Sequence, residues 1–343
     1  MPKRSAGRAR ATKPAPLVAR AFRELADGRF HSGEELAGRL GVSRSAFWKA
    51  VRTLRALGTP LEAVRNRGYR LERATEPLDA SRISGQLPRE VRECVVRLET
   101  EWSVGSTNTA LLERGGVGIG ATEVLLTEYQ TAGRGRRGRS WLAPPGGAIC
   151  LSLSWTFREV PPDLGALGLV IGVCALRALE ALDVRNVALK WPNDLVIDAR
   201  KLGGVLIDLR AESAGPAYVV IGIGLNIALG EQLLSKIAQL GAPAVDLASV
   251  CSAAPSRNAV AAGLVGECVR GLREFERRGL KAFGDAWRNA DTLRGRAVEV
   301  RAAEGSTARG FARGIDLHGA LILETPAGVQ RFISGDVSVR AVE

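Results

Sequence analysis

The chain has 343 residues, of which 46% are hydrophobic and 24% charged, a balance that excludes a fibrous or globally disordered protein. No apolar run reaches the ~18 residues of a membrane span, and the basic segment 1–16 lacks the apolar core of a secretory signal. Of the formal net charge of +12, residues 1–80 carry +9. A locally basic segment indicates a polyanionic partner, although a solvated basic face is the alternative.

The five cysteines are scattered, odd in number and without C-x-x-C spacing. This usage is typical of reduced thiols buried in a core. We therefore expect a reducing compartment, the cytoplasm, and no cysteine metal cluster. The cysteines are Cys94, Cys150, Cys174, Cys251 and Cys268.

The first elements after a disordered basic tail (1–16) predict a helix-turn-helix followed by a hairpin. Ser32 begins a capping-box pattern, Gly41 ends the helix that follows it, and Ser43 caps the next one. Two short apolar runs then flank a basic tip at 65–68, as in a β-hairpin. The predicted elements are helices 17–27, 33–40 and 44–57 and strands 61–64 and 69–71.

From residue 91 onward the sequence alternates between strands and helices, after a linker expected at 77–85. The strand at 148–155 alternates apolar and small residues, which predicts that one of its faces is buried and the other is not. The last part, from about residue 293, contains only short strands and glycine turns. Expected strands are 124–127, 148–155, 187–189, 203–209, 218–223, 298–300, 321–323 and 337–339, and expected helices are 164–182 and 257–278.

The segment 133–139, Gly-Arg-Gly-Arg-Arg-Gly-Arg, directly follows a predicted strand. Glycines allow close backbone approach to a ligand, and guanidinium groups neutralise phosphate and clamp carboxylate. The segment could be a flexible RNA-binding tract or an anionic small-molecule site. Because it is short and lies between two apolar strands, the small-molecule site is favoured.

Two lysine motifs follow strands, although the chain has only 7 lysines against 41 arginines. Lys190-Trp-Pro-Asn-Asp194 must turn at its proline, and its Lys, Asn and Asp suit a magnesium nucleotide. A polar turn with an internal Lys–Asp ion pair is the alternative. Lys201 stands beside Gly203-Gly204, as a phosphate-contacting ammonium would. Further along, the glycines of 222–226 (GIGLN) would allow a ligand to approach the backbone closely. The alternative is that this segment is an ordinary strand end.

Ser106-Thr107-Asn108 lies at the start of a predicted helix. These side chains could bind a neutral polar heterocycle, or they could simply form an N-cap and first turn. Neither His31 nor His318 has a partner in the sequence, so no hydrolytic triad is predicted.

The chain closely resembles the bifunctional biotin–protein ligases that also repress the biotin operon. The resemblance is carried by the order and spacing of its motifs, which are GRGRRGR followed by Trp141, then KWPND, KLGG and GIGLN. The resemblance covers the chain from about Val18 to its end. It implies an α/β (α+β) multidomain fold. Residues 17–76 would form a winged helix-turn-helix, 85–290 a central mixed-sheet α/β catalytic domain, and 293–343 a small C-terminal β-barrel.

The resemblance also implies the reaction. Biotin and Mg²⁺-ATP would form biotinyl-5′-adenylate, and the biotin would pass to a lysine of the biotin carboxyl carrier protein of acetyl-CoA carboxylase. Biotin operator DNA and a second copy of the chain would be further partners, and no membrane is involved.

The resemblance also implies the roles of individual residues, at the positions where the motifs match. Lys201, Arg136 and Lys190 would be catalytic. Biotin would contact Ser106, Thr107, Asn108, Gln130, Arg134, Gly135, Arg136, Lys201, Gly204 and Gly224. ATP and Mg²⁺ would contact Arg134, Arg136, Arg137, Arg139, Lys190, Asn193, Asp194 and Asn226, with Asp194 as the metal ligand. DNA would contact Ser43, Arg44, Ser45, Trp48, Lys49, Arg65 and Arg67.

One stretch departs from the family. Its repressor members carry an aromatic residue that packs over the adenine, whereas 240–247 (LGAPAVDL) has none. Neither retention of the adenylate nor ligand-linked dimerisation is therefore predicted by the resemblance.

Two other functions remain open. A lipoyl or octanoyl transferase shares the catalytic architecture, although the Arg-rich loop and KWPND disfavour it. A DNA-binding biotin sensor without ligase activity would need the same N-terminal segment, which could also be a docking module that does not bind DNA.

Overall fold

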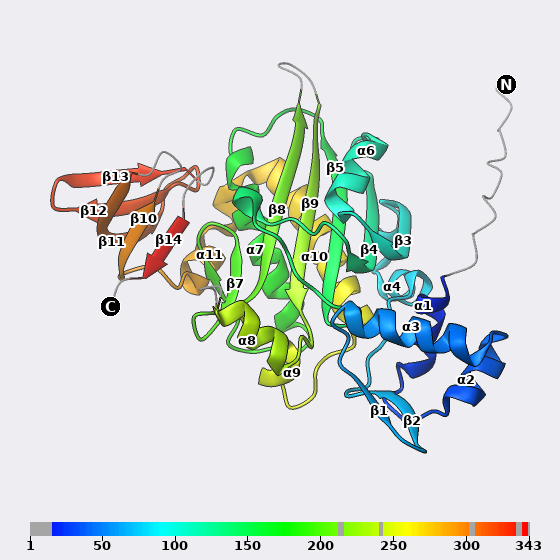
Figure 1. Cartoon of the computed structure of the whole chain (residues 1–343). Helices are drawn as coiled ribbons and strands as arrows, with labels where there is room; N and C mark the ends of the chain where they lie inside the picture. The colour runs from blue at the N-terminus through cyan, green and yellow to red at the C-terminus, as the bar shows by residue number, and fades with distance from the viewer. Residues whose placement is uncertain (1–15, 212–215, 240–242, 302–305, 334–337, 342–343) are drawn as a thin grey trace, which may run out of the picture. The chain divides into compact units, whose positions relative to one another are not determined.

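The computed structural model describes residues 16–211, 216–239, 243–301, 306–333 and 338–341 (Figure 1). Its contacts divide the chain into two units, Met1–Ala74 and Thr75–Glu343. Residues 1–15 of the expected basic tail lie outside the described ranges. Within those ranges, no helix combines the length and apolarity needed to cross a bilayer.

From residue 16 onward, the first unit forms three helices and a two-stranded antiparallel hairpin, as predicted. The Ser32 hydroxyl accepts a hydrogen bond from the Glu34 N–H, and the Ser43 hydroxyl accepts one from the Ala46 N–H. Both predicted N-caps are therefore confirmed. Gly41 adopts φ 65°, which glycine reaches without strain, and it ends the second helix. The elements are α1 (Leu17–Leu25), α2 (Gly33–Leu40), α3 (Arg44–Ala56), β1 (Leu61–Val64) and β2 (Gly68–Leu71).

A seven-stranded sheet forms the centre of the second unit. Its strand order is β3-β4-β5-β9-β8-β7-β6, with β3 and β4 parallel and every other pair antiparallel, so the predicted mixed sheet is confirmed. The strands are β3 (Val95–Val104), β4 (Thr122–Gln130), β5 (Ala148–Phe157), β6 (Ala188–Lys190), β7 (Asp194–Ile197), β8 (Arg200–Ala211) and β9 (Ala217–Asn226).

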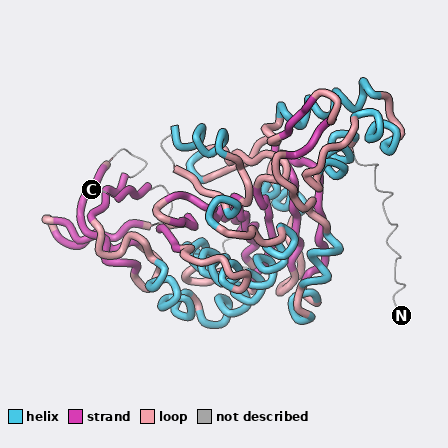
Figure 2. Tube along the Cα trace, turned by 90° about the horizontal axis from the view of Figure 1, so that it is seen from below, coloured by secondary structure: helices cyan, strands magenta, loops and turns pink. Residues whose placement is uncertain are grey.

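Helices cover both faces of this sheet (Figures 1 and 2). The apolar helix α7 (Leu167–Glu180) and the longer, amphipathic helix α10 (Arg257–Arg278) pack on one face, while α6 (Thr107–Arg114) contacts β4, β5 and β9 on the other. Every residue of β5 is therefore buried. The prediction of a half-buried strand was wrong, because the second face is also covered: Ser152 contacts α6, and Cys150 packs in a cluster with Leu229 and Trp141.

The segment expected as a linker, 77–85, contains most of helix α4 (Ala80–Gln86), which is followed by α5 (Arg89–Arg92). The Asp79 carboxylate caps α4 by accepting from the Arg82 N–H at 2.8 Å, and Ile83 is fully buried. The start of α10 holds this segment, since Asn258 Oδ1 accepts from the Asp79 N–H at 2.9 Å. The cap and the buried isoleucine explain why the chain is helical here.

The remaining helices of the second unit are short. They are α8 (Glu231–Gln239), α9 (Leu247–Val250) and α11 (Gly284–Ala290). They connect the sheet strands to α10 and to the C-terminal strands.

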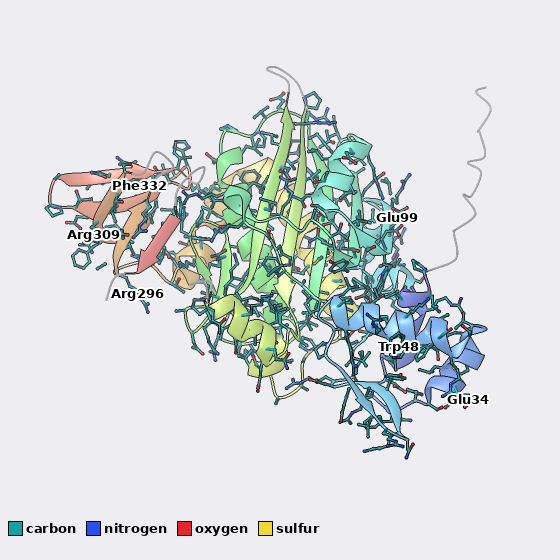
Figure 3. The ribbon with its side chains drawn as sticks, viewed as in Figure 1. Glu34, Trp48, Glu99, Arg296, Arg309 and Phe332 are labelled. Carbon is teal, nitrogen blue, oxygen red and sulfur yellow. The ribbon has the colours of Figure 1, made fainter. Side chains whose placement is uncertain are left out.

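The C-terminal strands form a five-stranded antiparallel sheet in the order β13-β12-β11-β10-β14, which carries Arg309 and Phe332 (Figure 3). Among the described residues β13 and β14 are the two edges and do not pair, so the expected closed barrel is not found. The sheet joins the central one through Trp191, whose indole N–H donates to the Gly319 carbonyl at 3.0 Å. The strands are β10 (Ala297–Arg301), β11 (Thr307–Ile315), β12 (Leu321–Thr325), β13 (Gly328–Phe332) and β14 (Ser338–Ala341).

Candidate active site and nucleic-acid interface

A cavity of about 580 Å³ opens on the face of the sheet that α6 covers. Its walls come from the start of α6, the end of β4, the segment 133–139 (the Arg/Gly loop), and strands β5, β8 and β9. The fold thereby brings together residues more than a hundred positions apart. The predicted site residues that line it are Ser106, Thr107, Asn108, Gln130, Arg134, Gly135, Arg136, Arg139, Asn193, Lys201, Gly204, Gly224 and Asn226.

One end of the cavity is neutral and polar. Gln130 Oε1 accepts from the Thr107 N–H at 2.9 Å and lies 3.2 Å from the Thr107 hydroxyl. Ser106 is the N-cap of α6, as predicted by the alternative in which Ser106-Thr107-Asn108 forms a helix cap and first turn. It also lines the cavity. Asn108 and Thr107 are each buried beside Ser152, whose hydroxyl lies 2.6 Å from Thr107 Oγ1 and 2.5 Å from Asn108 Oδ1.

Two glycines of β9 keep the cavity open. A Cβ on Gly222 would lie 2.2 Å from Asn108 Oδ1, and a Cβ on Gly224 would lie 2.6 Å from the ring of Trp141. Side chains at either position would displace a residue that lines the cavity. At both glycines, the backbone of a buried strand therefore lies close to a side chain that lines the cavity. Neither glycine is an ordinary strand-end residue.

The other end of the cavity is cationic. The Lys201 ammonium lies 6.0 Å from the centre of the Trp141 ring. Arg136 donates to Asn193 Oδ1 at 3.2 Å, and the same Asn193 amide donates to the Val205 carbonyl at 2.8 Å. The KWPND turn thus holds one guanidinium of the Arg/Gly loop at the cavity wall.

Three predicted residues do not line this cavity. Arg137 lines an adjacent hollow of about 500 Å³ together with Arg134, Arg136 and Arg139. Asp194 lies behind Lys201 and pairs with it. Lys190 stands opposite Asp194 in the β6–β7 hairpin.

Two further polar residues of the site, Ser152 and Asp208, were not predicted from the sequence. Asp208 accepts from Asn108 Nδ2 at 2.9 Å and from Arg134 Nη2 at 2.9 Å. Each residue had a signal: Asp208 stands an even number of positions after Gly204, and Ser152 alternates with leucines in a strand. Even spacing places residues on one face of a strand.

Among the described residues that line the cavity, Cys150 carries a thiol that could act as a nucleophile. Burial raises the pKa of the Cys150 thiol to about 12, so this cavity-lining cysteine is protonated at neutral pH. Among the described residues, no group of three or more His, Cys, Asp or Glu side chains could hold a metal ion.

The stretch that lacks the family's aromatic residue borders the cavity. Residues 240–242 lie outside the described ranges. The Lys201 N–H donates to the Pro243 carbonyl at 2.8 Å, and the Val245 N–H donates to the Lys201 carbonyl at 3.0 Å. This pairing places Ala244, together with Ile237 of α8, at the cavity wall, so the described contacts there are aliphatic.

In the first unit, a hollow of about 640 Å³ lies between α3 and the hairpin. Of the residues predicted to contact DNA, Arg44, Ser45, Trp48, Arg65 and Arg67 line it, whereas Ser43 and Lys49 are exposed beside it. Trp48, which Figure 3 labels, lies on α3. Its side chain is 47% exposed, and the Arg52 guanidinium lies 4.7 Å from the centre of its ring. The hollow therefore combines cations with an exposed aromatic ring.

Three family models match the chain. Residues 103–226 match the Biotin/lipoate A/B protein ligase family, residues 21–70 match an HTH domain, and residues 294–340 match the Biotin protein ligase C terminal domain. The first match contains the residues that line the cavity from α6 to β9. The second contains both α3 and the hairpin.

Curated relatives and solved structures agree with these matches. The bifunctional ligase/repressor BirA of Escherichia coli K12 is 36% identical over 332 residues, covering 97% of this chain and 98% of its own. The biotin–[acetyl-CoA-carboxylase] ligase of Mycobacterium tuberculosis is 34% identical and covers 70% of this chain and 88% of its own. The biotin protein ligase of Aquifex aeolicus in complex with biotin and ATP superposes with a TM-score of 0.60 at 25% identity, covering 72% of this chain and all of its own. The chain therefore belongs to the biotin–protein ligase family and, by its N-terminal HTH domain and its similarity along nearly the whole length of BirA, to the bifunctional ligase/repressors.

Proposed function

We propose that the protein is an ATP-dependent biotin–protein ligase. A carboxylate oxygen of biotin attacks the α-phosphorus of ATP, which releases pyrophosphate and leaves biotinyl-5′-adenylate. A lysine amine of the biotin carboxyl carrier protein then attacks the acyl carbon and releases AMP. The observation that carries this proposal is the meeting, in one cavity, of a neutral polar end and a cationic end.

The polar end suits the ureido ring of biotin. That ring has two N–H donors and a carbonyl acceptor, and the hydroxyls of Ser106 and Thr107 and the amide of Gln130 line the cavity at this end. Lipoyl and octanoyl chains have no such groups. They would form no hydrogen bonds with these side chains and would place apolar chain against a polar wall. The polar end therefore favours biotin over the acyl chains of the alternative transferases.

The cationic end suits two anions brought together. Lys201, Arg136 and Arg139 line it, and Lys190 stands on the adjacent hairpin. Adenylate formation needs the carboxylate and the α-phosphate held in contact while negative charge grows on phosphorus, which fixed cations stabilise. This explains how a cavity whose thiol is protonated can activate a carboxylate without a covalent enzyme intermediate.

Magnesium fits this site as a companion of ATP. Mg²⁺ is usually held by one or two carboxylates together with phosphate oxygens and waters. Asp194, which pairs with Lys201, and Asn193 are the oxygen donors of the KWPND turn nearest the cavity, so the ion would be held mainly by the triphosphate. When bound, it would neutralise the charge on the departing pyrophosphate.

The test is an acceptor-labelling assay with biotin, lipoate and octanoate side by side. Purified protein is mixed with Mg²⁺-ATP and a carrier domain, and the mass of the acceptor is measured. We expect a gain of biotin alone. Labelling only with lipoyl or octanoyl groups would support the transferase, and biotin binding without labelling would support a sensor.

For the first unit we propose repression of biotin-synthesis genes by a winged helix-turn-helix, with α3 in the major groove and the β1–β2 hairpin as the wing. Two copies would occupy two half-sites, as dimeric proteins of this kind do. The cytoplasm, where thiols stay reduced, is the proposed compartment, and all five cysteines are free.

A mobility-shift titration on DNA upstream of the biotin-synthesis genes, with and without biotin plus Mg²⁺-ATP, tests repression. Sedimentation of the same samples measures dimerisation. A shift equal to that on unrelated DNA would support the docking module.

A further inference from the structure

Arg134, the first arginine of the Arg/Gly loop, is engaged at the neutral end of the cavity. Its Nη2 donates to Asp208 Oδ1 at 2.9 Å, and its Nη1 donates to Thr109 Oγ1 at 3.1 Å. Both partners belong to regular elements, β8 and α6. The guanidinium thus ties the loop across the polar end of the cavity.

The second oxygen of Asp208 acts on another residue. Asp208 Oδ2 accepts from Asn108 Nδ2 at 2.9 Å, and the Leu206 carbonyl lies 3.3 Å from the same nitrogen. An ionised carboxylate accepts hydrogen bonds and donates none. The amino group of Asn108 must therefore face Asp208, and its carbonyl oxygen must face Ser152.

This orientation sets the direction of a chain of hydrogen bonds. Asn108 Oδ1 is an acceptor 2.5 Å from the Ser152 hydroxyl, which lies 2.6 Å from Thr107 Oγ1. The single Ser152 proton goes to Asn108, so the Thr107 hydroxyl donates its own proton, either to Ser152 Oγ or to Gln130 Oε1 at 3.2 Å. A lone pair of Thr107 is then left to accept an N–H at the cavity surface.

We propose that Asp208 is a positioning residue for biotin: its carboxylate orients Asn108, and through Ser152 and Thr107 it presents an acceptor to the ureido N–H. The same carboxylate holds Arg134 as a latch for the loop, so that this guanidinium serves the biotin end and not the triphosphate. This inference rests on the proposed ligase function. The Asp208 carboxylate would contribute to biotin recognition without contacting biotin itself.

The first test is Asp208→Asn, which preserves shape and can serve only one of its two partners as an acceptor. The biotin dissociation constant, measured by calorimetry without ATP, should rise roughly 10- to 100-fold, in line with the loss of a hydrogen bond to a charged group. The KM for ATP and the kcat at saturating biotin should stay within about twofold. Asp285→Asn, which removes an exposed carboxylate paired with Arg288, is the matched control and should change neither constant.

The second test separates the latch from a phosphate contact. If Arg134 acts through Asp208, Arg134→Gln weakens biotin binding in the wild-type chain and adds little in the Asp208→Asn background. An Arg134→Gln variant whose KM for ATP rises equally in both backgrounds would overturn the latch. If Asp208→Asn proves unfolded by circular dichroism, Asp208→Glu, which keeps the charge, is compared with it and should retain more biotin affinity.

The outcomes distinguish this inference from the function itself. A wild-type protein that labels the acceptor with biotin, beside an Asp208→Asn variant of unchanged biotin affinity, overturns the role of Asp208 alone. A wild-type protein that neither binds biotin nor labels the acceptor overturns both.

Discussion

The Lys201 ammonium donates to Asp194 Oδ1 at 2.6 Å across the β7–β8 pair. Both side chains are about three-quarters buried, at 29% and 23% exposure. The carboxylate holds the ammonium at the cavity wall, where its nitrogen lies 6.0 Å from the centre of the Trp141 ring. Asp194 therefore contributes to the site through Lys201, whichever role it has toward the metal.

Replacing Lys201 by alanine should remove adenylate formation while the protein stays folded. Loss of one preorganised cation lowers the rate by on the order of 10²–10³. Pyrophosphate release under single-turnover conditions measures it. Lys281→Ala, at an exposed position in the short 3-10 helix Leu280–Phe283, is the control and should keep the wild-type rate. A Lys201→Ala variant of full activity would remove this residue from the site.

Gly224→Ala should raise the KM for biotin and lower ligation. The new Cβ would lie 2.6 Å from Trp141 Cε2, so the indole must move from the cavity wall. The matched change is Gly266→Ala in α10, where a Cβ meets nothing within 4 Å. There alanine should leave the activity unchanged and stabilise the helix by about 0.5–1 kcal/mol. Equal kinetic effects of the two variants would contradict the predicted crowding.

Arg44→Ala and Arg67→Ala should weaken DNA binding in a salt-dependent manner. Each lost phosphate contact should reduce the slope of log K against log[salt] by about 0.9. Arg44 is largely exposed, with Glu34 at 3.7 Å as its ion partner, and both arginines line the hollow beside the hairpin. Arg185→Ala, an exposed position of the second unit, is the control. Unchanged slopes in both variants would favour the docking module.

Glu76→Gln should change how stability depends on pH. Burial alone would raise the pKa of this carboxyl, but hydrogen bonds from Ser256, Asn258 and Arg82 lower it below its ordinary value of 4.5. A carboxyl with a depressed folded-state pKa stabilises the protein above pH 4.5 and loses that contribution as the pH falls through the folded-state pKa.

The wild type should therefore exceed Glu76→Gln in the free energy of unfolding at pH 7, and the difference should shrink at acidic pH. Urea denaturation at several pH values measures this. A difference that grows on acidification would have the wrong sign.

Local signals in the sequence were sufficient for the helix-turn-helix and for the long helix α10. Serine caps, a glycine at a positive φ and a 3.6-residue apolar period act between near neighbours, so they can be identified without knowing the rest of the fold. The Arg/Gly loop, KWPND, KLGG and GIGLN were identifiable for the same reason. Each motif is continuous in the chain, and its residue types already indicate an anionic ligand.

Tertiary structure decided which of those motifs meet, and it added residues that carry no motif. Asp208 becomes part of the site because β8 pairs with β9 and places it beside Asn108 of α6, 100 residues earlier in the chain. The complete burial of β5 and the open C-terminal sheet also depend on strand order. Strand pairing joins segments far apart in sequence, and its register selects which side chains share a cavity, so no local pattern could specify these contacts.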